Sequence, residues 1–321
     1  MRAATAALAF GIAALFLLAL LVPLQSLPLL WSEERDLAVD VLLELRLPRA
    51  LLAIGYGGLL GASGAAIQGL FANPLASPDI TGASAGAALG AVLAAYTFGL
   101  TSPLLLSFAA IVGALAALAA LLALAGPRAE TGTLLLAGLA ISAMASAATT
   151  VALALAPSPF AFYDAYDWLM GSLVDRSLAQ AAFALAPALL VVILLQRERQ
   201  ALDRLTLGEE VAQSYGHDVG ALRLRIICLT AIGVGACVAI CGAIGFIGLV
   251  APVFARKLTR GHPGRAILPA AAFGAALLLA ADLLTRGAPL GRSLPIGVVT
   301  ALLGAPFFLW LVARMRWRLQ P

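Results

Sequence analysis

Ten long apolar stretches follow one another along this chain, and they restrict the folds open to it more than any other feature. They run over residues 5–30, 50–71, 80–98, 103–125, 132–156, 178–196, 222–243, 246–258, 266–284 and 294–313. A helix needs about 20 mostly apolar residues to cross the ~30 Å hydrocarbon layer of a bilayer. Because most stretches have this length, the sequence predicts an all-α polytopic membrane protein with about ten transmembrane helices.

Composition excludes a soluble domain. Of the 321 residues, 62% are apolar and 11% are charged, against roughly 45–50% and about 25% in soluble proteins. The net charge of +4 comes from basic residues at stretch ends and in loops, with no basic stripe that would fit a nucleic acid. We therefore expect one transmembrane domain over residues 1–321, with the lipid bilayer and no nucleic acid among its partners. The first stretch is longer than a signal-peptide core of about 7–15 residues, so we expect it to be retained.

The basic residues also predict the orientation of the chain. With ten spans, the 20 Lys and Arg residues divide into fourteen on the side of both termini and six on the other. Cytoplasmic loops of membrane proteins carry the excess of Lys and Arg. Both termini are therefore expected in the cytoplasm, although arrangements with nine or eleven spans stay open.

The polar segment 197–221 is the longest loop on the predicted cytoplasmic side. Gly208 precedes Glu209 and Glu210, and acidic residues favour the first turn of a helix. Gly216 fits the end of that short helix, and Asp218 fits the cap of a second short helix. A helical loop of this kind indicates a docking surface for a partner, the alternative being a plain connector.

No cofactor site is visible in the sequence. The chain has no GxxxxGK pattern followed by Ser or Thr, so ATP, if it is used, must be bound by another chain. The two histidines lie far apart in loops, and the three cysteines fall in one apolar stretch. Neither set has the spacing of a metal site or a disulfide framework.

Glycines recur at four-residue intervals in the second and third stretches. They are Gly57 and Gly61 in the second, and Gly82, Gly86 and Gly90 in the third. Small residues at this spacing form a smooth helix face on which a neighbouring backbone packs closely. We predict tight helix packing at these positions, a feature of any large membrane bundle.

Two segments rich in proline or glycine interrupt the apolar pattern. Residues 73–79 contain Pro74 and Pro78, and they predict a rigid turn between the second and third helices on the cytoplasmic side. Residues 242–252 contain three glycines and Pro252, and they predict a hinge or a re-entrant corner. Pro252 also makes the eighth stretch the weakest of the ten spans.

Ionisable residues are rare inside the stretches. Asp282 lies near Arg286 at the external end of the ninth stretch, where a local ion pair is favoured over a proton relay. No catalytic set of Ser, His and Asp and no HExxH pattern is present. These absences argue against an intramembrane enzyme and against an ion-coupled carrier, and they indicate that energy arrives from outside the bilayer.

Several sequence blocks, in one order along the chain, resemble the FecCD-type permease family, whose members serve ABC (ATP-binding-cassette) importers for iron siderophores, haem and vitamin B12. The blocks are residues 45–49, 63–70, 73–76, 82–87, 168–172, 207–216, 242–252, 282–283, 294–300 and 304–308. One departure is Pro252-Val253, where the family usually has Pro-His.

The resemblance implies a type II ABC importer permease in the bacterial inner membrane, working by alternating access. It implies a homodimer, with the pathway at the two-fold axis between the fifth helices. It also implies two cytoplasmic ATPase subunits that bind ATP and Mg²⁺, and a periplasmic substrate-binding protein. The cargo would be an iron chelate (siderophore or haem) or a corrinoid.

The resemblance also assigns roles to residues. Those expected at the ATPase-coupling surface are Leu207, Gly208, Glu209, Glu210, Ala212 and Gly216. Those expected to dock the binding protein are Arg46, Arg49 and either Arg292 or Arg286. For each arginine the alternative is an anchor on lipid phosphate. Arg176 lies where the external mouth is expected and could attract an anionic ligand, the alternative being a plain helix-end residue.

Two other functions stay open from sequence. An ion-coupled secondary transporter would show uptake that collapses with an uncoupler while ATP is maintained. A structural or channel-like subunit would show no ATP hydrolysis stimulated by partners. The docking-type loop and the ion-poor spans favour the importer.

Overall fold

The computed structural model describes residues 2–22, 31, 34–100, 102–126, 129–286 and 294–318, and these residues form helices and no strands. The helices are α1 (Arg2–Leu21), α3 (Arg35–Asp40), η1 (Val41–Arg46), α4 (Leu47–Leu70), η2 (Pro78–Thr81), α5 (Ala83–Phe98), α6 (Pro103–Ala125), α7 (Thr131–Ala154), α8 (Pro159–Leu169), α9 (Leu178–Arg197), α10 (Arg199–Leu205), α11 (Glu209–Ser214), α12 (Val219–Cys241), α13 (Ile247–Leu258), α14 (Ile267–Arg286) and α15 (Ile296–Arg318).

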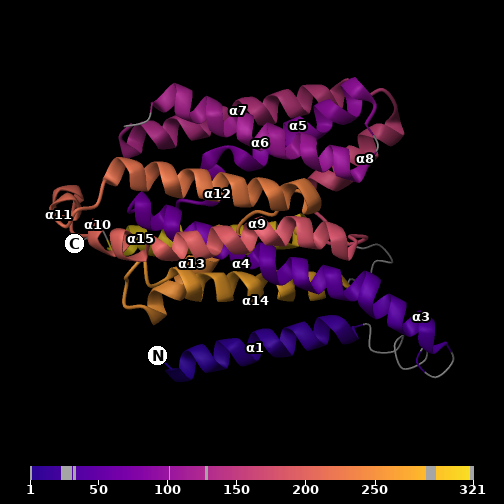
Figure 1. Ribbon diagram of the computed structural model, residues 1–321, viewed down its shortest axis with the longest axis horizontal. Helices are drawn as coiled ribbons and strands as arrows, with labels where there is room; N and C mark the ends of the chain where they lie inside the picture. Colours follow the sequence, from indigo (N-terminus) through magenta and orange to yellow (C-terminus); the bar gives the residue numbers. More distant parts are fainter. Residues whose placement is uncertain are drawn as a thin grey trace.

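Ten of these helices coincide with the ten apolar stretches, which confirms the predicted fold class. Seven are long and apolar enough to cross a membrane, two shorter apolar helices lie at Ala6–Leu21 and Ala83–Phe98, and α13 has 12 residues. They run side by side as a bundle (Figure 1). The short helices α10 and α11 lie at one end of it, here called the α11 end, and α3 and α8 lie at the other, here called the α8 end.

The segment before the second span is not a separate loop. Helix α3, the π-helical η1 and α4 follow without a break from Arg35 to Leu70, over 36 residues. Pro48 stands in the first turn of α4, and since it has no N–H to donate, a carbonyl one turn earlier loses its helical partner. The wider π turn lies at this place, as such turns do where the regular ladder is interrupted.

Helix α4 lies at the centre of the bundle, with most of its side chains buried. Gly57 and Gly61 face α14, where an added β-carbon would lie 2.8 Å from Leu278 Cβ and 2.7 Å from the carbonyl carbon of Ala270, respectively. Real β-carbons do not come this close to such atoms, so only glycine allows α4 and α14 to approach this far.

The third-span glycines divide into two kinds. Gly86 and Gly90 face α6, where β-carbons would lie 3.2 Å and 3.0 Å from atoms of the Gly113 backbone. Gly82 instead has φ +74° and precedes the first residue of α5. It is needed for a left-handed turn of the backbone, which glycine adopts readily.

The segment between α4 and α5 turns back into the bundle, which differs from the turn predicted for residues 73–79. A β-carbon on Gly248 would lie 2.6 Å from Pro78 Cδ and 3.0 Å from the carbonyl oxygen of Leu60. Leu60 lies ten residues before the end of α4, or about 15 Å along the helix. Residues 71–82 are therefore re-entrant, because glycines on neighbouring elements leave room for the buried Pro78.

The second interruption lies where the glycine-rich pattern predicted a hinge or a re-entrant corner. Helix α12 ends at Cys241, and α13 begins at Ile247 after a non-helical segment in which Phe246 has φ +66°. Since Gly248 in the first turn of α13 contacts Pro78, the two irregular segments meet inside the bundle. Irregular backbone is tolerated at this depth only where protein or water covers it.

Candidate functional site

The predicted coupling loop forms the surface of the α11 end. Leu207, Gly208, Glu209 and Glu210 are exposed, whereas Ala212 is fully buried and holds α11 against the bundle. Gly208 and Gly216 bracket α11 with φ values of +109° and +84°. Asp218 accepts a hydrogen bond from the Ala221 N–H at 3.0 Å, so it caps the long helix α12, whereas the sequence predicted a second short helix there.

Polar contacts tie this loop to the bundle. Glu209 forms an ion pair with Arg223 of α12. Arg225, also on α12, pairs with Glu198 at 2.7 Å, and Asp203 accepts from the Gly264 N–H at 2.8 Å. Of these contacts, the Glu209–Arg223 pair joins α11 directly to α12.

A second cluster gathers the predicted docking arginines at the α8 end. Asp282 is 1% exposed and pairs with Arg49 and with Arg286, both at 2.6 Å. The pairing with Arg286 confirms the local ion pair expected from sequence, whereas the partnership with Arg49, 233 residues away, was not predicted.

The same arginines bind the first helix. Arg286 Nη1 donates to the Ala19 carbonyl at 2.5 Å, and Arg46 Nη1 donates to the Leu20 carbonyl at 2.9 Å. Arg49 and Arg286 thus share the Asp282 carboxylate, whereas Arg46 and Arg286 bind carbonyls of α1. All three side chains are largely buried by these contacts. Their docking role stays a prediction, and Arg292 lies outside the described residues.

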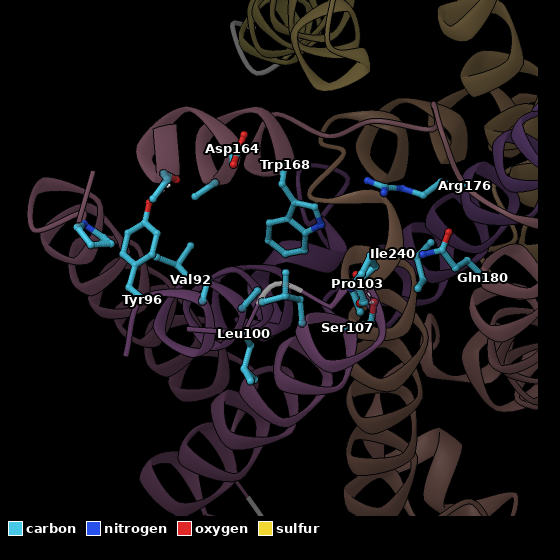
Figure 2. Close-up of a pocket in the computed structure, with 17 residues that line it drawn as sticks. Val92, Tyr96, Leu100, Pro103, Ser107, Asp164, Trp168, Arg176, Gln180 and Ile240 are labelled. Carbon is cyan, nitrogen blue, oxygen red and sulfur yellow. Dashed lines mark hydrogen bonds between the residues drawn. The ribbon is translucent and has the colours of Figure 1, made fainter. Parts of the chain in front are cut away.

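Arg176 lines a cavity of about 340 Å³ at the α8 end. Figure 2 shows its side chain at one end of the cavity, with Trp168 and Asp164 of α8 along one wall. Arg176 Nε is buried without a hydrogen-bond partner among the described residues. Tyr96 of α5 donates to the Ala161 carbonyl at 2.9 Å and holds α8 over the cavity. The other residues that line this cavity come mainly from α5, α6, α8, α9 and α12 of the same chain.

A second hollow, of about 410 Å³, lies beside α7. Its polar lining consists of Asp79, Ser84, Ser142, Ser146, Thr149 and Thr150. The four α7 residues follow helical spacing and share one face. Sequence reasoning missed this group, although hydroxyl residues at helical spacing in the fifth stretch were a visible signal. Asp79 joins them only because residues 71–82 re-enter the bundle.

Comparison with known proteins identifies the family. The profile of the FecCD transport family matches residues 6–314. The Vitamin B12 import system permease protein BtuC of Vibrio cholerae is 40% identical, over 88% of this chain and 85% of that protein. The Fe(3+)-citrate import system permease protein YfmE of Bacillus subtilis is 39% identical, over 85% and 81%.

A solved structure agrees with these relatives. It is described as an inward-facing conformation of a metal-chelate type ABC transporter, and it superposes with a TM-score of 0.84 at 30% identity, covering 95% of this chain and 98% of its own. The chain therefore belongs to the FecCD transport family.

Proposed function

We propose that this chain is the transmembrane permease subunit of an ABC importer, and that it moves an iron chelate or a corrinoid across the bacterial inner membrane. The observation that carries the proposal is the exposed helix α11, bracketed by two glycines and tied to α12, on a chain that belongs to a family of transport permeases. Relatives named for vitamin B12 and for iron citrate support the cargo class.

The partners follow from this assignment. Two ATPase subunits bind ATP and Mg²⁺ and dock on the α11 end of a permease homodimer. The α11 end, where α1 begins and α15 ends (Figure 1), faces the cytoplasm. A periplasmic binding protein delivers cargo to the α8 end, where its acidic side chains meet Arg46, Arg49 and Arg286.

Transport proceeds by alternating access. Closure of the ATPase dimer displaces α11, and the Glu209–Arg223 pair carries the displacement into α12. Helix α12 ends at Cys241, and the next residue, Gly242, lies beside the carbonyl of Trp168 in α8, so movement at one end reaches the other. The ATP-bound ATPase drives the cycle because it favours one conformation of the permease over the other.

The decisive experiment is ATP hydrolysis by the permease–ATPase complex in liposomes, with and without the cognate binding protein. We expect the binding protein to stimulate hydrolysis, and we expect Glu209→Lys to reduce the stimulated rate severalfold, because the reversed charge repels Arg223 and alters the exposed face of α11. Glu130→Lys is the matched control, since Glu130 is exposed on the same side and lies outside α11.

Two outcomes would overturn the assignment. One is a chain that co-purifies with no ATPase. The other is uptake that collapses with an uncoupler while ATP is maintained, which would indicate an ion-coupled secondary transporter.

A further inference from the structure

Asp79 is an exposed carboxylate that lies level with the middle of α4 and has no ion-pair partner among the described residues. It follows Pro78, which contacts Gly248 at the level of Leu60, near the middle of α4. Its side chain is exposed to the hollow beside α7, and no Lys, Arg or His of the described residues forms an ion pair with it. A charge at membrane depth is costly, and such residues face a water-filled cavity or a functional site.

The surroundings of Asp79 keep it in place without neutralising it. Ser84 Oγ donates to Asp79 Oδ1 at 2.9 Å, and Ser142 Oγ donates to the Asp79 carbonyl at 3.2 Å. The carboxylate also lies near the first turn of α5, whose free N–H groups favour negative charge. These contacts explain how an anion is tolerated, and Asp79 still lines the hollow. Its second carboxylate oxygen, Oδ2, accepts only a long hydrogen bond of 3.5 Å from Ser77.

The hydroxyl groups of the lining are mostly engaged as donors. Thr149 Oγ1 donates to the Ala145 carbonyl and Thr150 Oγ1 donates to the Ser146 carbonyl, both at 2.9 Å. Ser142 already donates to Asp79. A hydroxyl whose hydrogen is used within the chain presents only lone pairs to a ligand. The hollow therefore offers one carboxylate and a row of acceptors, which suits a ligand rich in N–H groups.

We propose that Asp79, with Ser142, Ser146, Thr149 and Thr150, forms a cargo-contacting site that selects for charge and hydrogen-bond donors. The proposal rests on the proposed function and on the pathway that the family resemblance implies between the fifth helices of the homodimer, which are the α7 helices. The site favours a neutral or cationic chelate or corrinoid that presents amide or ammonium N–H groups. It disfavours polycarboxylate chelates, because like charges repel strongly where water is scarce.

Thiol modification tests the charge of the site without a binding protein. The three cysteines of the permease are first replaced by alanine, and Ser146→Cys is introduced into that background. The complex of this variant with the ATPase is then treated with one of two methanethiosulfonate reagents, a cationic trimethylammonium compound or an anionic sulfonate. We expect the cationic reagent to react about tenfold faster, after correction for intrinsic rates, and Asp79→Asn to abolish this difference. Val151→Cys, exposed elsewhere on α7, is the control and should be indifferent to Asp79.

Protection from labelling tests the class of cargo. Millimolar ferrioxamine B, a cationic iron chelate with ammonium and amide groups, should slow modification of Ser146→Cys severalfold when Asp79 is present and not in Asp79→Asn. Ferric dicitrate, a polyanion, should protect neither. Equal protection by the two chelates, or a reagent preference unchanged in Asp79→Asn, would overturn the proposal.

The two proposals fail in different ways. If Ser146→Cys reacts with neither reagent while the wild-type complex hydrolyses ATP and takes up cargo, the Asp79 site is wrong and the importer assignment holds. If the wild-type complex shows no uptake coupled to ATP, the importer assignment itself is wrong.

Discussion

Asp282 is the buried carboxylate at the α8 end on which two arginines converge. Its carboxylate accepts from Arg49 on α4 and from Arg286 on its own helix, and Arg286 in turn binds the Ala19 carbonyl of α1. Three helices are thus joined through one buried anion. The same arrangement limits how the arginines can serve a partner, since their positions depend on Asp282.

Replacing Asp282 by Asn should destabilise the protein markedly. The substitution leaves two guanidinium groups close together and largely buried without an anion, a defect that costs about 3–5 kcal/mol. The thermal unfolding midpoint in detergent should therefore fall clearly. Asp36→Asn, at an exposed position of α3, should leave it unchanged. An Asp282→Asn protein as stable as the wild type would show that the cluster does not hold α1, α4 and α14 together.

At the scale of helices, close approach of α4 and α14 depends on residues that lack a β-carbon. Gly57 and Gly274 face one another across the contact, and Gly61 faces Ala270. The lengths and positions of these helices follow from local hydrophobicity, and for that reason the ten stretches predicted ten helices correctly. The contacts between these helices join residues far apart in sequence, so local hydrophobicity does not predict them.

Gly61→Ala should test this contact. The new β-carbon would meet the Ala270 backbone, so the helices must separate, at a cost of about 1–3 kcal/mol. Equilibrium unfolding in a mixed detergent series would measure the loss. Gly11→Ala in α1, where nothing lies within 4 Å of the added atom, provides the control. Equal stability of the two variants would contradict the packing described here.

The candidate sites likewise divide into features set by local sequence, which could be predicted, and features set by contacts between distant residues, which could not. The short helix α11 was predictable because its signals, two glycines and two acidic residues, are local, whereas its coupling role stays a prediction. The hollow at Asp79 was not, because prolines predict a turn but not its direction. That direction depends on the room that Gly248 leaves for Pro78. The Arg49–Asp282 pair joins residues far apart in sequence and needed the fold in the same way.

At the scale of the whole molecule, the two ends are connected through α12. Its first turns hold the coupling loop through Arg223 and Arg225, and its last residue precedes Gly242, which lies against α8. A rigid helix of 23 residues transmits displacement better than the irregular segments that adjoin it. Coupling between ATP hydrolysis and transport should therefore depend on how firmly α11 is held.

Arg223→Ala tests this dependence while leaving the exposed residues of α11 intact. We expect the ATPase to bind and hydrolyse ATP, but the amount of cargo imported per ATP should fall severalfold, because α11 moves without carrying α12. Uptake and hydrolysis measured together in proteoliposomes give this ratio. Arg265→Ala is the control, since Arg265 is 65% exposed and lies 3.8 Å from its acidic neighbour Asp203. An unchanged ratio in Arg223→Ala would place the coupling elsewhere.

The re-entrant segment has a consequence for how the chain is made. Helix α5 has only 16 residues, or about 24 Å at 1.5 Å per residue, which is short of the ~30 Å hydrocarbon layer. Its irregular lead-in, residues 71–82, carries backbone groups that lipid cannot satisfy. During synthesis, α5 therefore cannot be released into lipid on its own. It must stay next to the translocation machinery until α6 has been synthesised and packs against it. In that contact Gly86 and Gly90 of α5 lie against Gly113 of α6.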